Sequence, residues 1–157
     1  MFNPLEPLSR WLRTGGFIFW NREKAGQARP DEDLGAGGER IAADYLKRQG
    51  YRILTRQHRQ RLGEIDIIAV DRQVIVFVEV KTWRSDHDAD PSAAVTLDKQ
   101  DKITRTALTY LKRHRLLNQP ARFDVISVVW NGDPNCQPKI RHFQNAFEAT
   151  GRGQMFR

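Results

Sequence analysis

Two segments of the chain carry apolar residues at the three- and four-residue spacing of an amphipathic helix. The stripe of the first segment consists of Ile41, Ala42, Tyr45 and Leu46. The stripe of the second consists of Ile103, Ala107, Tyr110 and Leu111. Gly50 follows the first stripe as a stop signal, so the pattern predicts helices over about 36–49 and about 97–116.

Alternating and short apolar runs between and after these helices predict strands. The expected strands span 51–57, 64–70, 74–80, 123–130 and, shortest, 139–143. The third is apolar on both faces, which is typical of a central strand. A three-residue turn at 71–73 would join the second strand to the third and place Asp66 opposite Val78. Helix, three strands, helix and two strands predict an α/β fold with a mixed central β-sheet flanked by helices.

The first part of the chain differs from the rest. Residues 1–34 contain prolines, glycines and scattered aromatic residues without a persistent period, and we interpret them as an N-terminal extension. The pattern leaves open whether this extension is a flexible tail or a docking element. Residues 35–150 form the expected single domain, and 151–157 a C-terminal tail.

The chain also lacks the usual signals of export. No apolar run approaches the ~20 residues of a membrane-spanning helix, and no secretory signal pattern opens the sequence. The single cysteine, Cys136, cannot form an internal disulfide, which favours a reducing compartment. We therefore expect a cytoplasmic protein with no membrane partner.

Composition adds an electrostatic clue. The 26 Lys and Arg against 19 Asp and Glu give a net charge of +7, so a polyanion such as DNA is the first partner to consider. Basic residues gather after the first helix and along the second. The groups are Lys47, Arg48, Arg52, Arg56, Arg59 and Arg61, and Lys99, Lys102, Arg105, Lys112, Arg113 and Arg115. Each group fits either phosphate contacts or a solvated basic face.

Carboxylates and a lysine interrupt apolar strand faces. Glu79 and Lys81 end one face of the third strand, and Asp66 interrupts a face of the second. A bulge or a longer turn would bring Asp66 beside Glu79. Two carboxylates at so short a distance repel each other unless a proton or a cation lies between them. A set of ligands made only of oxygen atoms suits Mg²⁺ or Mn²⁺. The alternative is a simple Glu79–Lys81 ion pair at the end of the sheet.

Two further acidic residues invite opposite interpretations. Glu39 precedes Ala42 by three and so lies on the inward stripe of the first helix. A glutamate in a first helical turn also favours the helix dipole, but beside the strand carboxylates we expect it to belong to the site. Asp124, at the start of a strand, is expected to cap or pair structurally.

These residues carry a resemblance. Asp66 followed by Glu79-Val80-Lys81 resembles the D…(D/E)-x-K signature of restriction-endonuclease-like nucleases, and longer motifs resemble the YraN family of small bacterial proteins. The motifs are Gly38-Glu39-Arg40, Gly63-Glu64-Ile65-Asp66, Val76–Thr82, Lys99-Gln100 and Arg122-Phe123-Asp124-Val125, with His142 and Asn145-Ala146-Phe147. The resemblance spans residues 35–148 and implies a fold like that of archaeal Holliday-junction resolvases. This sequence has Gln57 where the family usually has asparagine, and Trp83 where it usually has arginine.

The resemblance implies a metal-dependent nuclease that cleaves DNA, with branched or structured DNA among its candidate substrates. Asp66, Glu79 and the Val80 carbonyl would hold the cation, Lys81 would act on the attacking water and the phosphate, and Glu39 would bind metal directly or through water. The residues expected to contact nucleic acid are Lys47, Arg48, Arg56, Arg59, Arg61, Lys99, Lys102 and Arg105. Two alternatives stay open: a non-catalytic nucleic-acid-binding module of this fold, and a homodimeric interaction protein.

Overall fold

The computed structural model describes residues 33–85, 95–133 and 135–151. The expected N-terminal extension, except its last two residues, and the C-terminal tail beyond Gly151 lie outside the described residues. The element order is α2 (Leu34–Arg48), β1 (Arg52–Gln60), β2 (Gly63–Asp71), β3 (Val74–Trp83), α3 (Leu97–Arg113), β4 (Ala121–Val129) and β5 (Lys139–Phe147). No helix in these stretches is long and apolar enough to span a membrane.

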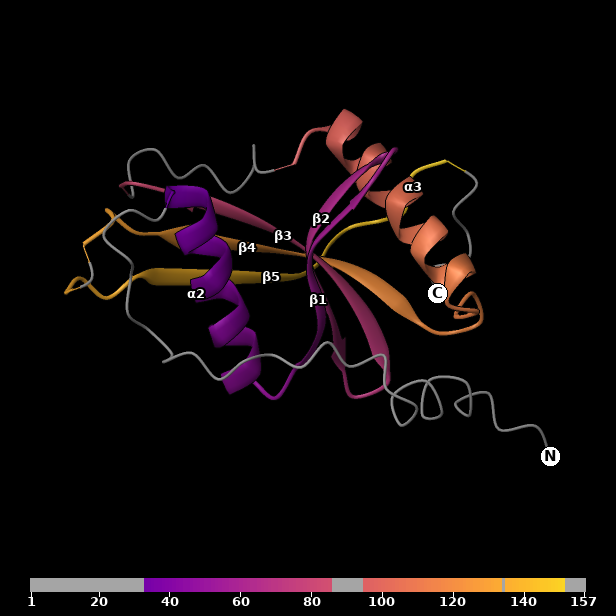
Figure 1. Ribbon diagram of the computed structural model, residues 1–157, viewed down its shortest axis with the longest axis horizontal. Helices are drawn as coiled ribbons and strands as arrows, with labels where there is room; N and C mark the ends of the chain where they lie inside the picture. The colour runs from indigo at the N-terminus through magenta and orange to yellow at the C-terminus, as the bar shows by residue number, and fades with distance from the viewer. Residues whose placement is uncertain (1–32, 86–94, 134, 152–157) are drawn as a thin grey trace.

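The strands form one mixed sheet in the order β1-β2-β3-β4-β5 (Figure 1). All neighbours are antiparallel except β3 and β4, which are parallel and are joined through α3. A parallel pair needs such a crossover connection, which is why a helix separates these two strands in the chain. The expected α/β class and mixed sheet are confirmed.

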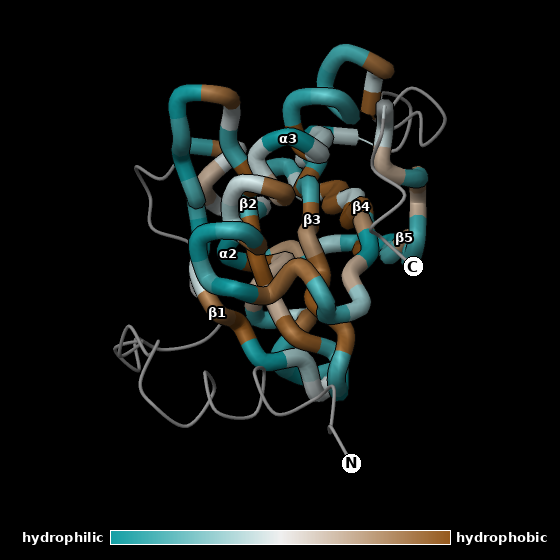
Figure 2. The backbone as a smooth tube through the Cα atoms, turned by 90° about the vertical axis from the view of Figure 1, so that its right-hand side faces the viewer, coloured by the Kyte–Doolittle hydropathy of each residue, from teal (hydrophilic) through white to brown (hydrophobic). Residues whose placement is uncertain are grey.

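The sheet separates two apolar cores, because successive residues of β3 point to opposite faces. Ile75 and Phe77 pack with the apolar stripe of α3, whereas Val76 and Val78 pack with that of α2. Figure 2 shows the hydrophobic stretches of β2, β3 and β4 in the middle of the molecule. Burial on both faces explains why β3 reads as a continuous apolar run.

Two adjacent glycines let α2 approach the sheet closely. A Cβ atom on Gly37 would lie 2.5 Å from the ring of Trp130, and one on Gly38 would overlap the Thr82 side chain. Only glycine therefore fits at both positions without a shift of the neighbouring side chains. The helix is thereby held against the ends of β3 and β4, and Glu39 follows directly on this contact.

The turn between β2 and β3 corrects one expectation. Asp71 pairs with Val74, so the turn contains two residues rather than three. Ile67 lies opposite Val78, and the prediction that Asp66 would do so is wrong. The shorter turn shifts the register by one residue, which brings Asp66 level with Glu79 without the bulge that the sequence analysis required.

Other element boundaries differ at the ends of the edge strands and of α3. β1 continues to Gln60 and β5 to Phe147, beyond the expected ends. Both strands lie at an edge of the sheet, so their polar, exposed continuations lack the apolar alternation that marks a strand. α3 ends at Arg113 rather than at residue 116 because Arg115 adopts a left-handed φ of 58°.

Candidate functional site

The candidate site lies where β2 and β3 part. Their last backbone pair is Ile67 with Val78. Just beyond it, the Val80 N–H donates to Asp66 Oδ2 at 2.7 Å, so a side chain takes over from the main-chain ladder. β2 continues in pairing with β1 alone, and its Gly63 end packs against Thr106 of α3. The hairpin thus separates from the central strands at Asp66, and we call this point of separation, with the side chains gathered there, the notch.

Two carboxylates and two ammonium groups meet in this notch. Asp66 is 9% exposed and Glu79 4%. Glu79 Oε1 lies 3.0 Å from Lys81 Nζ and 3.4 Å from Lys99 Nζ. The other oxygen, Oε2, is buried and has no hydrogen-bond partner among the described residues. An acceptor left in this state costs free energy in a finished core, so the site has spare capacity to bind a cation or a donor.

Burial and crowding perturb the acidity of Asp66. Burial and the neighbouring Glu79 raise its pKa from 3.8 to about 7, and Glu39 contributes in the same direction. The Val80 N–H and Lys99 oppose the rise without cancelling it. Near neutral pH the Asp66 carboxyl is therefore divided between its protonated and ionised forms, which is the behaviour of a group placed for exchange with a proton or a cation.

Glu39 lies beside this cluster and belongs to a different contact. Its Oε2 accepts a hydrogen bond from Gln57 Nε2 at 3.0 Å. Gln57 is level with Asp66 in the β1–β2 pair and has a left-handed φ of 50°. Asparagine tolerates this conformation better than glutamine does.

The structure thus brings Asp66, Glu79 and Lys81 together, with Val80 between the two strand residues as a donor to Asp66. It leaves Glu39 at the side. Nowhere in the described stretches do three or more His, Cys, Asp or Glu side chains form a group that could hold a metal ion. A divalent cation would consequently depend on Asp66 and Glu79, and the buried Glu79 Oε2 fits that role. Mg²⁺ is commonly held by one or two carboxylates, with water and phosphate oxygens completing its shell.

Besides Lys99, which contacts Glu79, at least four of the eight residues expected to contact nucleic acid form ion pairs with neighbouring acids. These pairs are Lys47–Asp44 at 3.7 Å, Arg59–Glu64 at 3.4 Å, Lys102–Asp98 at 2.7 Å and Arg105–Asp101 at 3.3 Å. Exposed pairs of this kind are weak and exchange readily with other charges. Lys47 and Arg56, with Arg52, line a groove of about 500 Å³ beside the edge strand β1.

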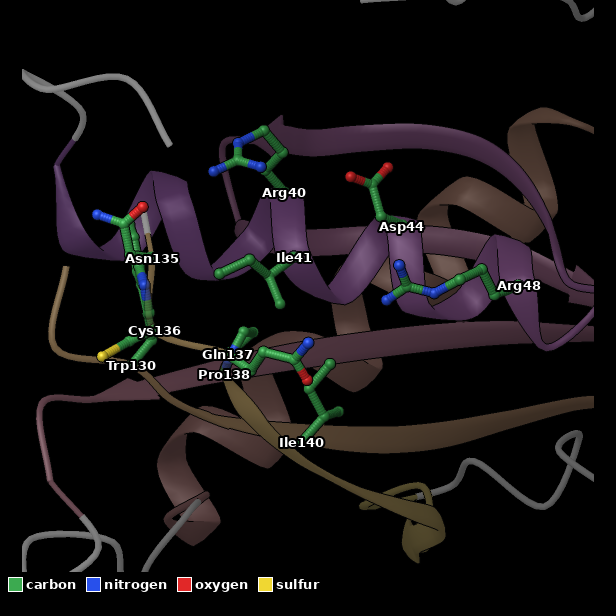
Figure 3. A pocket seen from close by; sticks show the side chains of 10 residues that line it. All are labelled: Arg40, Ile41, Asp44, Arg48, Trp130, Asn135, Cys136, Gln137, Pro138 and Ile140. Carbon is green, nitrogen blue, oxygen red and sulfur yellow. The ribbon is translucent and has the colours of Figure 1, made fainter. Parts of the chain in front are cut away.

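A second cavity, of about 510 Å³, lies between α2 and the segment leading into β5. Figure 3 shows Arg40, Asp44 and Arg48 along α2, with Ile41 directed toward Pro138 and Ile140 across the gap. None of the residues in the notch lines this cavity. It is separate from the carboxylate site.

Asp124 forms a different kind of cluster. The fully buried carboxylate accepts from Arg122 Nε and the Asn145 N–H, both at 2.9 Å, and lies 2.9 Å from His142 Nε2. Arg122 also pairs with Asp71 at 3.0 Å. Burial alone would raise the pKa of Asp124, but the hydrogen bonds from His142, Arg122 and Asn145 outweigh it and lower the pKa. The structural pairing expected for Asp124 is confirmed.

Sequence reasoning did not place Lys99 or Gln57 in the site. The basic pattern predicts phosphate contacts for Lys99, whereas its ammonium group lies against Glu79. One feature of the sequence does point to Lys99. It falls in the first turn of a helix, where the helix dipole disfavours a positive charge. Gln57 carried no signal in the hydrophobic pattern, since its role depends on a backbone angle.

Comparison with known proteins gives the family. Residues 38–128 match the uncharacterised protein family UPF0102. A UPF0102 protein of Geobacter metallireducens is 50% identical over 118 residues, covering 75% of this chain and 94% of the relative. One of Clostridium botulinum is 46% identical over 119 residues, covering 75% and 96%. UPF0102 protein RB9115 of Rhodopirellula baltica is 41% identical over 146 residues, covering 90% and 87%.

The matched region includes most of α2, the whole of the notch and most of β4. It also confirms the resemblance to the YraN family that the sequence motifs indicated. The chain therefore belongs to the uncharacterised protein family UPF0102.

Proposed function

We propose that the protein is a metal-dependent nuclease that cleaves DNA phosphodiester bonds. The observation that carries the proposal is the pair of neighbouring buried carboxylates, Asp66 and Glu79, of which Glu79 keeps one oxygen without a hydrogen-bond partner among the described residues. A purely structural ion pair would need Glu79 and one lysine. It would gain nothing from a second carboxylate whose pKa is raised to about 7 by burial and by Glu79.

Each residue of the notch has a role in this chemistry. Asp66 and Glu79 would hold Mg²⁺ or Mn²⁺, with the Val80 carbonyl as a main-chain ligand. The bound cation supplies Lewis acidity and lowers the pKa of water. Lys81 Nζ, 3.0 Å from Glu79, orients the attacking water and donates to the phosphate oxygens on which negative charge develops. Glu39, fixed by Gln57, accepts hydrogen bonds from water at the rim of the notch.

The electrostatics of the molecule favour a nucleic-acid substrate. The net charge is +7, and the groove beside β1 is lined by Lys47, Arg52 and Arg56. Arg56, at one end of this lining, is followed in the chain by Gln57, which contacts Glu39. Contacts of this kind are made to the phosphate backbone and select for the shape of DNA rather than its base sequence. Branched or otherwise structured DNA is the substrate class we propose.

The direct test is cleavage of a panel of linear, single-stranded, flap and four-way DNA with Mg²⁺ or Mn²⁺. We expect the wild type to cut at least one form. Asp66→Asn removes a charge that the cation needs and should abolish cleavage while leaving DNA binding intact or slightly tighter. Lys81→Ala should abolish cleavage while metal binding survives, since an ammonium donates and does not coordinate. Variants as active as the wild type would trace the activity to a contaminating nuclease.

A second candidate function is a nucleic-acid-binding module that does not cleave. The observation in its favour is that no three ligating side chains meet within the described part of the chain. A wild type that is inert on every DNA form, with no melting shift on addition of Mn²⁺, would favour this candidate.

Both candidates require a DNA-binding surface, which a salt titration examines. Replacing Arg56, Arg59 and Arg61 with alanine should weaken DNA binding and flatten its dependence on salt, because fewer counterions are released. The matched control replaces Lys112, Arg113 and Arg115, which removes the same charge at and just beyond the C-terminal end of α3. Equal effects of the two triple variants would mean that the overall charge of the protein attracts DNA, and that Arg56, Arg59 and Arg61 have no special part in binding.

A further inference from the structure

Lys99 lies on α3, whereas Lys81 and Glu79 lie on β3, and the two lysines share one carboxylate oxygen. We propose that Lys99 is an internal counter-ion that competes with the divalent cation for Glu79. In this account the ammonium group neutralises Glu79 when no metal is bound and leaves it when a metal binds. The inference rests on the proposed function, since it concerns the cation of the same site.

Helix formation does not account for a lysine at this position. Thr96 caps α3, and its Oγ1 accepts the Lys99 N–H at 3.3 Å, so Lys99 lies in the first turn. The backbone dipole makes this end of a helix positive, and the residue favoured three positions after the cap is an acid that completes a capping box. The preceding Asp98 follows that preference. A residue that contradicts its local rule is expected at a functional site.

When both carboxyls are ionised, the charges of the notch balance only while the metal is absent. Asp66 and Glu79 can supply two negative charges, and Lys81 and Lys99 supply two positive ones. Both ammonium groups contact Oε1 of Glu79, and Oε2 has no hydrogen-bond partner in the part of the chain that the structure describes. A divalent cation held between the carboxylates would give four positive charges against two, so one lysine must withdraw.

Lys99 is the lysine able to withdraw. Lys81 belongs to the same strand as Glu79, two residues along, where both side chains share one face. Lys99 reaches the carboxylate from a separate element and at the longer distance, 3.4 Å against 3.0 Å, while the two lysine side chains are similarly exposed, at 29% and 33%. Its flexible four-carbon stem can turn toward solvent or toward an arriving phosphate without any change in the sheet.

Titration of the full-length protein with Mn²⁺, followed by calorimetry and by the electron paramagnetic resonance of free Mn²⁺, tests this exchange. Lys99→Met should bind Mn²⁺ roughly tenfold more tightly than the wild type, because a competing charge has gone from beside the ligand. Lys102→Met is the matched control, with the same charge lost one turn along, where the lysine pairs with Asp98. It should bind as the wild type does.

Two further variants separate the charge of Lys99 from its packing. Lys99→Gln keeps a donor for Glu79 without the charge, and it should also tighten Mn²⁺ binding. It tests the proposal independently if the methionine variant does not fold, which melting without metal reveals. Lys99→Arg keeps the charge and should stay within about twofold of the wild type.

The outcomes distinguish this inference from the proposed function. Equal Mn²⁺ affinity in the wild type, Lys99→Met and Lys99→Gln would reduce Lys99 to a structural ion-pair partner and overturn the inference, with the metal site intact. Binding by the uncharged variants alone would support it strongly, since Lys99 would then exclude the metal. Binding by none of the proteins would overturn both the inference and the proposed metal site.

Discussion

The two strands that flank β3 each bury an aspartate, and the two aspartates differ in every respect that decides their role. Asp124 of β4 is fully buried and has partners from Arg122, His142 and Asn145, which lower its pKa. Asp66 of β2 is 9% exposed, accepts one main-chain N–H and faces Glu79, and its pKa is raised to about 7. Burial alone does not mark a functional carboxylate. A functional carboxylate is marked by burial together with too few hydrogen-bond partners.

The backbone beside each aspartate repeats this contrast. Gln57 is level with Asp66 and has φ 50°, and Asn145 next to Asp124 has φ 51°. Asparagine is among the few residues other than glycine that adopt this conformation readily, whereas glutamine is not. At Asn145 the conformation also serves the fold, because its N–H donates to Asp124 at 2.9 Å. Strain therefore lies on the side of the proposed active site.

The largest expected effect on stability is at the Asp124 cluster, in which both carboxylate oxygens have hydrogen-bond partners. Asp124→Asn removes the charge that holds Arg122 and replaces two acceptor oxygens by one. We expect it to lower the free energy of unfolding by about 3–5 kcal/mol, as breaking a buried ion pair does. Urea unfolding of the two variants Asp124→Asn and Asp66→Asn makes the comparison. Equal losses in both would remove the distinction between the clusters.

The second effect has the opposite sign. A carboxyl whose pKa is raised from 3.8 to about 7 by folding binds more protons in the folded state, so its ionisation costs stability as pH rises through that window. At pH 8 and without metal, Asp66→Asn should raise the free energy of unfolding by about 1–3 kcal/mol, and the gain should vanish near pH 4. Asn Oδ1 can still accept the Val80 N–H.

Unfolding curves at pH 4, 6 and 8 check this prediction. Glu64→Gln is a suitable control, because it removes a half-exposed carboxylate from the same strand. A loss of stability in Asp66→Asn at pH 8 would mean that the ionised carboxylate is well satisfied in the folded protein.

The sequence predicted the elements of the fold and the residues of the notch better than it predicted their contacts. Hydrophobic periods located both helices, and alternation located all five strands, because burial of apolar side chains decides these elements. The register between Asp66 and Glu79 depended on whether the turn after Asp71 contains two residues or three, which apolar alternation does not encode. Contacts between distant elements, such as Lys99 with Glu79, follow from packing and leave no period in the chain.

The smallest effect concerns the backbone beside each aspartate. Gln57→Asn should raise the free energy of unfolding by up to about 1 kcal/mol, and Asn145→Gln should lower it by a similar amount. Thermal melting at a pH near neutrality measures both. Effects of the same sign at the two positions would show that the left-handed conformation does not distinguish the two regions.

The proposed nuclease function depends most directly on whether Asp66 and Glu79 hold a divalent cation. Calorimetric titration of Mn²⁺ at pH 8 should show binding to the wild type, with unchanged affinity in Glu64→Gln and at least tenfold weaker affinity in Asp66→Asn, given the loss of one of two carboxylate ligands. Wild-type affinity should also fall when the pH is lowered to 6, because Asp66 then retains its proton. An Asp66→Asn isotherm that matches the wild type, or a wild type that binds no Mn²⁺, would contradict the proposed site.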